Sequence, residues 1–197
     1  MIEDNALNAF ATGRDPGHAV VCATTGLLER LDRVEIEGVI AHELSHIKNY
    51  DILLSSIVAV LVGTIGLVSD WIMRNLWWSN FGKDNDRDNK NPFFAFFMIV
   101  VLILTPIVAT LIQLAISRQR EFLADSSGVL LTRYPQGLIR ALEKIADYPG
   151  QLRTANSATA HLFISNPFKK TKKSSWLTSL FNTHPPIDER IRILQNM

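Results

Sequence analysis

Two long runs without a charged residue constrain the fold of this chain more than any other feature. Residues 52–68 carry only three polar hydroxyl side chains, and residues 93–116 form a second uncharged run. A transmembrane helix needs about 17–25 mostly apolar residues. The alternative for each run is a buried core helix, but a small domain cannot bury a helix as long as the second run that is apolar on every side. The two runs therefore predict a pair of membrane-spanning helices.

Two such spans divide the chain into five parts. We expect a loop at residues 69–92, and we expect the flanking parts, 1–51 and 117–197, to form one domain on the opposite side of the membrane. The net charge is only +1, so no strong electrostatic field points to nucleic acid. The partner that the two spans imply is the lipid bilayer, and the oligomeric state stays open.

A metal-binding motif precedes the first apolar run. His42, Glu43 and His46 form the pattern H-E-x-x-H inside a periodic apolar stretch that predicts a helix. On a helix the two histidines share one face, whereas Glu43 lies about 100° around the axis and is badly placed as a ligand. Two histidines with a flanking carboxylate are typical of zinc hydrolases. The alternative is two surface histidines, but two of only five histidines fall in this spacing.

A catalytic zinc takes three protein ligands and keeps one position open. His161, His184 and several carboxylates are candidates for the third ligand, and Glu121 is favoured by geometry. At 1.5 Å per residue, His46 lies about 9 Å before the first run and Glu121 about 7.5 Å after the second. An antiparallel pair of spans brings both to one height, on helices that continue into the spans. Asp125, one turn further, is expected to hydrogen-bond a ligand imidazole; a pair of surface acids is the alternative.

The N-terminal part predicts a β-hairpin. Residues 8–12 and 19–25 are strand-like, and the turn residues 13–17 between them include glycine, aspartate and proline. One strand is expected at a sheet edge, where an extended substrate can add its backbone. The residues expected to bind substrate in this way are Asn8, Ala9, Phe10 and Ala11. A plain edge strand without this role is the alternative.

Taken together, these motifs resemble those of the HtpX-type membrane zinc metalloproteases, relatives of the CaaX prenyl endoprotease. The likeness rests on H-E-L-S-H before one apolar run and E-F-L-A-D after the next, with N-A-F-A-T-G-R at 8–14, A-H-L-F-I at 160–164 and T-H-P-P at 183–186. It implies an α+β membrane protein, mainly α, with a gluzincin-like H-E-x-x-H helix, a small β-sheet and two transmembrane helices. It also implies one Zn²⁺ per chain on His42, His46 and Glu121, with Glu43 as catalytic base.

The resemblance further implies a multi-pass protein of the cell membrane with its catalytic domain on the cytoplasmic side. Its substrates would be unfolded or membrane proteins, cleaved in membrane protein quality control. Members of this family have two further membrane helices and a strand ahead of the region that matches Asn8, and this chain starts without them. A catalytically inactive membrane scaffold or adaptor is therefore the alternative expectation.

The expected chemistry assigns roles to the remaining polar residues. Zinc acidifies a water molecule, and Glu43 accepts its proton and passes it to the leaving amine. The developing oxyanion needs a further donor, for which His184 is the candidate; helix capping or packing is its alternative role. His161 is expected to be structural, and Arg190 to bind a substrate carboxylate or a surface acid. A purely structural zinc is disfavoured because such a site does not use Glu43.

Overall fold

The computed structural model describes residues 1–13, 15–81, 92–148 and 184–197, with the backbone alone at 76–81 and 92–98. These residues form two compact units, one made of residues 1–54 and 116–197 and the other of residues 55–115. His161 and the end of the expected 69–92 loop lie outside the described residues. We call the two units the first unit and the second unit.

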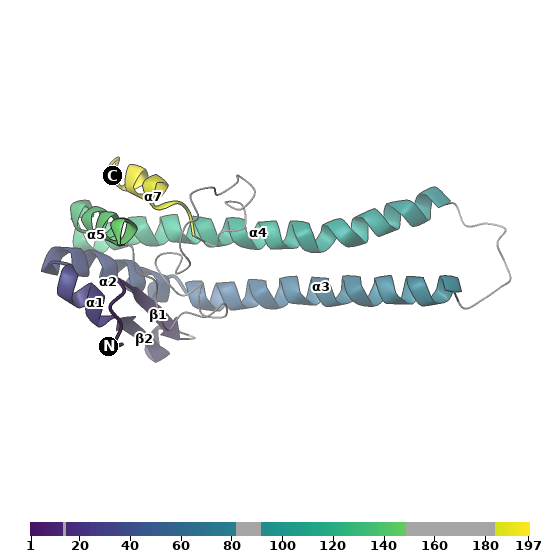
Figure 1. The fold of residues 1–197 in the computed structure, drawn as a ribbon, viewed down its shortest axis with the longest axis horizontal. Coiled ribbons are helices and arrows are strands. Elements are labelled where there is room, and N and C mark those ends of the chain that lie inside the picture. Colours follow the sequence, from purple (N-terminus) through teal and green to yellow (C-terminus); the bar gives the residue numbers. More distant parts are fainter. Residues whose placement is uncertain (14, 82–91, 149–183) are drawn as a thin grey trace. The chain divides into compact units, whose positions relative to one another are not determined.

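The first unit begins with the expected hairpin (Figure 1). Strands β1 (Ala9–Gly13) and β2 (Ala19–Ala23) are antiparallel, with Ala9 opposite Ala23, and the 3-10 turn η1 (Pro16–His18) precedes β2. Gly13 has a φ of +136°, and a Cβ atom there would collide with the carbonyl oxygen of His18. Only glycine fits this position, so the turn signal in the sequence has a steric cause.

Helix α1 (Thr25–Arg30) leads into α2 (Arg33–Lys48), which carries the H-E-x-x-H motif. A reciprocal pair of hydrogen bonds starts α2: Asp32 accepts from the backbone N–H of Glu35 at 2.9 Å, and Glu35 accepts from that of Asp32 at 2.8 Å. The helix ends at Lys48, and Tyr50 turns the chain with a φ of +56°. The expectation that the histidine helix runs on into the first apolar helix is therefore wrong.

Two helices carry the apolar runs: α3 (Asp51–Phe81) and α4 (Pro92–Thr132). Both are long and apolar enough to cross a membrane, over Asp51–Asn75 with a mean hydropathy of 2.4 and over Ile99–Thr132 with 2.6. Large apolar side chains on both are exposed, Leu67 by 73%. This exposure is unlike that of the core helix of a soluble protein, and the expected fold class of helices, hairpin and two apolar spans is confirmed.

The expected start of the connecting loop at residue 69 is wrong, because α3 continues to Phe81. Hydropathy falls at Asp70, but residues 69–81 contain neither glycine nor proline. Asp70 and Arg74 form an ion pair one turn apart, which supports the helix. The apolar run therefore ends before the helix does. In the same way α4 extends beyond Ile116 and carries Glu121 and Asp125.

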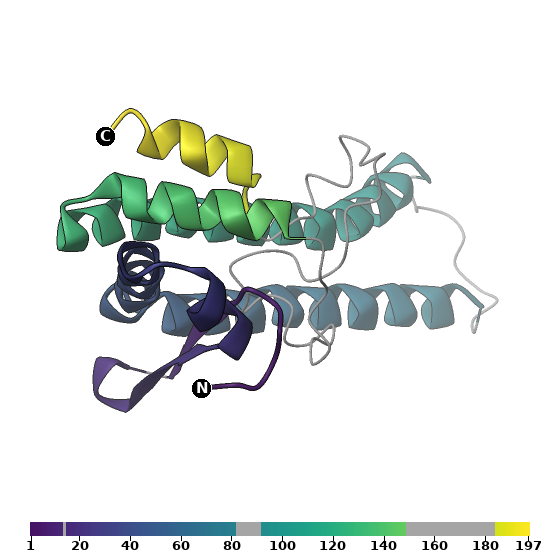
Figure 2. The ribbon, with the colours of Figure 1, turned by 60° about the vertical axis from the view of Figure 1, so that its left-hand side comes forward.

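The core of the first unit lies between α2, the hairpin and two C-terminal helices, α5 (Pro135–Asp147) and α7 (Ile187–Leu194) (Figure 2). Leu27, Val39, Leu142 and Leu194 are buried in it, each contributing about 1.5–3 kcal/mol relative to exposure. Gly38 lets α2 and α5 approach closely, because a Cβ atom there would lie 2.7 Å from the backbone nitrogen of Leu138. This packing fixes α2 and the face that carries its histidines.

Candidate metal centre

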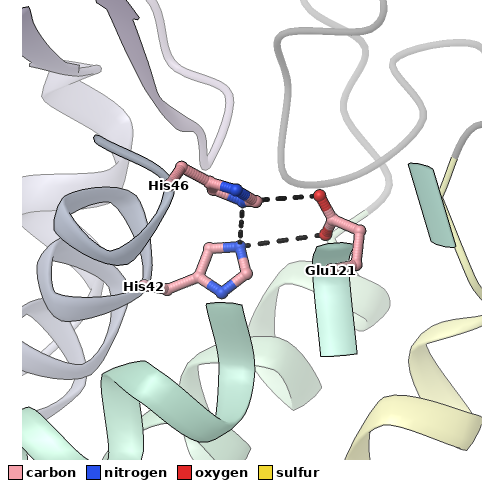
Figure 3. A group of neighbouring side chains, drawn as sticks. All are labelled: His42, His46 and Glu121. Carbon is pink, nitrogen blue, oxygen red and sulfur yellow. Dashed lines mark hydrogen bonds and ion pairs between the residues drawn. The ribbon is translucent and has the colours of Figure 1, made fainter. Parts of the chain in front are cut away.

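Three side chains from two helices converge at one point of the first unit (Figure 3). Nε2 of His42 lies 3.1 Å from Nε2 of His46, and the two carboxylate oxygens of Glu121 lie 3.4 Å from His46 Nε2 and 3.8 Å from His42 Nε2. Glu121 comes from α4, as the height argument expects. Among the described residues, these three form the one group of histidine, cysteine or acidic side chains arranged to hold a metal.

Gly128 allows this convergence. It stands two turns after Glu121 on α4, and a Cβ atom at this position would lie 3.1 Å from the backbone nitrogen of His42. Few Cβ atoms come this close to a neighbouring backbone atom. The glycine therefore lets the backbones of α4 and α2 lie in direct contact. The close approach brings Glu121 within reach of two histidines on another helix.

The donor set fits a zinc ion. Tetrahedral zinc with bonds of about 2.0–2.1 Å separates its ligand atoms by about 3.4 Å, close to the three distances observed here. Each imidazole has a carboxylate beside its Nδ1 atom: Asp125 lies 2.9 Å from His42, and Asp51 lies 2.7 Å from His46. An Nδ1–H that donates to a carboxylate leaves the Nε2 lone pair free. Two lone pairs and the Glu121 carboxylate then face one another, an arrangement that a cation stabilises.

The electrostatics of His46 lead to the same conclusion. Burial alone lowers the pKa of His46, but the hydrogen bond and the negative charge of Glu121 outweigh it, so the pKa is raised. The three side chains therefore attract positive charge to this point.

Glu43 lies beside the three metal-binding candidates but is not one of them. Its side chain is buried, and the backbone of Ala11 on β1 hydrogen-bonds to its carboxylate. Burial raises the pKa of the Glu43 carboxyl, against the opposing effect of the two imidazoles. A buried carboxylate with a raised pKa has the properties of a general base.

Asp125 lies at His42, as the sequence predicts, and a buried arginine holds it there. Arg190 of α7 is 1% exposed and donates to both carboxylate oxygens of Asp125, at 2.8 and 2.6 Å. Its Nη1 atom is also 3.4 Å from Oε2 of Glu121. Burial alone lowers the pKa of Arg190, but the charge of Asp125 raises it above its usual range. The expected roles of Arg190, binding a substrate carboxylate or a surface acid, are therefore wrong.

Sequence reasoning missed the pair Asp51 and Arg120. Asp51 accepts from Nδ1 of His46, and Arg120 of α4 forms an ion pair with Asp51. The signal that could have found Asp51 is its position: it is the charged residue directly before the uncharged run 52–68. Its distance of five residues from His46 hides the contact, because helical partners are three or four apart.

His184 and the hairpin occupy two further places around the centre. Nδ1 of His184 lies 3.2 Å from Oε2 of Glu121, so this histidine reaches the centre from the segment before α7. Ala9 and Ala11 lie on β1 with their side chains buried. The backbone N–H of Asn8 donates to Oγ1 of Thr24, and its carbonyl accepts from Thr24. His18 is at the surface and pairs with Asp15.

Comparison with known proteins finds the same kind of protein repeatedly. The profile of peptidase family M48 matches residues 1–197. A protease HtpX homolog from Caldanaerobacter subterraneus is 51% identical over 193 residues, which cover 96% of this chain and 62% of that protein. One from Tropheryma whipplei is 49% identical over 197 residues, covering 100% of this chain and 65% of that protein. The chain thus spans less than two thirds of the length of these relatives.

A solved structure shares the fold. The crystal structure of Ste24p from S. mikatae has a TM-score of 0.60 and 25% sequence identity, and the match covers 96% of this chain and 43% of that one. The resemblance read from the sequence motifs is thereby confirmed.

Proposed function

The chain belongs to peptidase family M48, and from this premise we propose that it is a membrane-integrated zinc endopeptidase that hydrolyses peptide bonds of protein substrates. The observation that carries the proposal is the convergence of His42, His46 and Glu121, with Glu43 buried beside them. A structural zinc site is normally closed by four protein ligands, whereas a catalytic site has three and an open position. Three candidate ligands and an adjacent carboxylate fit the catalytic type.

In this proposal His42, His46 and Glu121 hold one zinc ion. Bound zinc supplies Lewis acidity, which lowers the pKa of a water molecule and polarises a carbonyl group. Glu43 accepts the proton of the attacking water and then donates it to the nitrogen of the leaving amine. The raised pKa of Glu43 suits both steps, because the carboxyl must take and release the same proton.

His184 is proposed to donate a hydrogen bond to the oxyanion that develops on the substrate carbonyl. Support comes from its position, with Nδ1 3.2 Å from Glu121. Pro185 and Pro186 follow it directly and restrict the backbone there, which limits the conformations of this segment.

The substrate is proposed to bind as an extended strand along β1. In the described part of the chain β1 has one strand neighbour, β2. The backbone of Ala11 points away from β2 to Glu43, and alternation along a strand turns the backbone of Ala9 the same way. The carbonyl oxygen of Ala11, whose N–H is bonded to Glu43, and the backbone of Ala9 would therefore supply the hydrogen bonds to the substrate. Asn8 would contribute its side chain, since its backbone is bonded to Thr24, and Phe10 would contribute contact area.

The cellular setting is proposed from the two apolar helices and the relatives. We place α3 and α4 across the cell membrane and the first unit on the cytoplasmic side. Unfolded or misassembled membrane proteins are the proposed substrates, in membrane protein quality control. Support comes from the exposed apolar surface of both helices and from the HtpX homologs that match the whole chain.

Glu43→Gln tests the proposal. The substitution removes the proton acceptor and keeps the three proposed ligands, so zinc should remain near one per chain while hydrolysis of an unfolded protein such as casein is lost. Zinc is measured by elemental analysis of the purified chain in detergent, and a chelator should abolish the parent's activity. Loss of zinc together with activity would make Glu43 a ligand, and a zinc-loaded parent without activity would favour the scaffold alternative.

A further inference from the structure

The two candidate imidazole ligands are supported in the same way. Behind His42 stands Asp125, which Arg190 holds with two hydrogen bonds. Behind His46 stands Asp51, whose carboxylate accepts from Nδ1 at 2.7 Å and pairs with Arg120. Asp51 is 5% exposed, so its charge is compensated by protein groups and not by water. We call Asp51 and Arg120 the His46 support.

We infer that Asp51 is a positioning residue that orients His46 for the metal, and that Arg120 acts through it. The inference rests on the proposed metal site. Asp51 accepts a hydrogen bond from the Nδ1–H of His46. This bond fixes the tautomer that has a free lone pair on Nε2, and it fixes the plane of the ring. Nε2 is the atom that faces His42 and Glu121.

The turn between α2 and α3 brings Asp51 to the ring of His46. If α2 continued as a helix, Asp51 would lie about 140° around the axis from His46 and could not reach its ring. The helix instead ends at Lys48, and Tyr50, with a φ of +56°, redirects the chain. A non-glycine residue in the left-handed region costs conformational energy, and such residues are kept where surrounding contacts enforce them.

Arg120 supplies those contacts from α4. Its guanidinium donates to the carbonyl oxygen of Asn49 at 2.7 Å and to the carboxylate of Asp51, one residue on each side of Tyr50. It therefore caps the C-terminus of α2 and holds the turn at once. Arg120 also precedes Glu121 in the chain, so one turn of α4 carries both a proposed ligand and the holder of the His46 support.

The zinc affinity of the 197-residue chain in detergent tests the inference. Asp51→Asn should raise the zinc Kd by about 10–100-fold, measured by competition with a chromophoric chelator. Arg120→Gln should raise it less, and the double variant should equal Asp51→Asn, because Arg120 acts through Asp51. With Co²⁺ in place of zinc, Asp51→Asn should also change the visible absorption spectrum, which reports ligand geometry.

Asp70→Asn is the matched control. Asp70 lies on the same helix and also pairs with an arginine, Arg74, but it is exposed. Its variant should bind zinc as the parent does.

Three outcomes are decisive. A parental Kd and Co²⁺ spectrum in folded Asp51→Asn would overturn the inference and leave the proposed function standing. If Asp51→Asn does not fold, Arg120→Gln decides by the same criterion. A parent chain that binds no zinc would instead overturn the proposed function, on which the inference rests.

Discussion

Removal of Arg190 should destabilise the first unit more than an ordinary core substitution does. Arg190→Met keeps most of the apolar stem but leaves the carboxylate of Asp125, which is 1% exposed, without its cation. Two charge-assisted hydrogen bonds, at 2.8 and 2.6 Å, are lost. At about 1.5–3 kcal/mol each, they agree with the cost of about 3–5 kcal/mol expected for breaking a buried ion pair. Such a loss is a large share of a typical domain's stability of about 5–15 kcal/mol.

A second substitution separates the orphaned charge from lost packing. Asp125→Asn removes the charge and keeps an oxygen that can accept from Nδ1 of His42. Arg190→Met combined with Asp125→Asn should therefore be more stable than Arg190→Met alone by about 2 kcal/mol, a recovery of the orphaned-charge cost. The measurement is urea unfolding of the zinc-free chain in detergent, followed by circular dichroism.

Arg192→Met controls for the helix. Arg192 lies on α7 and is exposed, so its variant should unfold within about 0.5 kcal/mol of the parent. A loss of unfolding free energy below about 1 kcal/mol in Arg190→Met, against the expected loss of about 3–5 kcal/mol, would contradict the role of the buried ion pair. So would a double variant whose loss of unfolding free energy equals the sum of the losses of the two single variants.

Three further predictions concern the centre, the packing and the topology. Glu121→Ala should abolish tight zinc binding, and Asp125→Asn should weaken it by about 10–100-fold in equilibrium titration; parental affinity in Glu121→Ala would remove it from the ligand set. Gly38→Ala should cost about 1–3 kcal/mol in urea unfolding, because its Cβ would meet the backbone of Leu138, whereas Gly63→Ala, with open space around it, should cost nothing. A reporter inserted between Lys83 and Lys90 should be active only outside the cytoplasm, and cytoplasmic activity would contradict the proposed topology.

Hydropathy and helix formation are separate properties, so the end of an apolar run does not mark the end of a helix. The apolar run ends at Val68, but α3 continues to Phe81, because a helix needs only the absence of breakers and not apolar side chains. At the N-terminal end of the run the helix breaks although the sequence pattern contains no breaker. The helical pattern of α2 predicts no interruption before Asp51, and the break at Tyr50 is enforced by Arg120, a residue of another helix.

The sequence by itself determined the arrangement of the H-E-x-x-H motif, because its residues are close together on one helix. His42 and His46 share a face of α2 because four residues make about one helical turn, and Glu43 lies beside them for the same reason. Glu121 could be added because two antiparallel spans return the chain to the side of the membrane that it left, and His46 and Glu121 lie at similar distances from their ends. Its neighbour Asp125 follows from the same one-turn spacing.

Only the tertiary structure decided what holds these residues in place. Arg190 reaches Asp125 across 65 positions of the chain, and Arg120 reaches Asp51 across 69. Such pairs leave no periodic pattern, because they depend on how α4 packs against α2 and α7. A buried arginine also reads in sequence like any surface arginine, until the packing shows that its charge is enclosed. The sequence therefore determines which side chains can bind the metal, and the packing of distant helices determines how they are oriented.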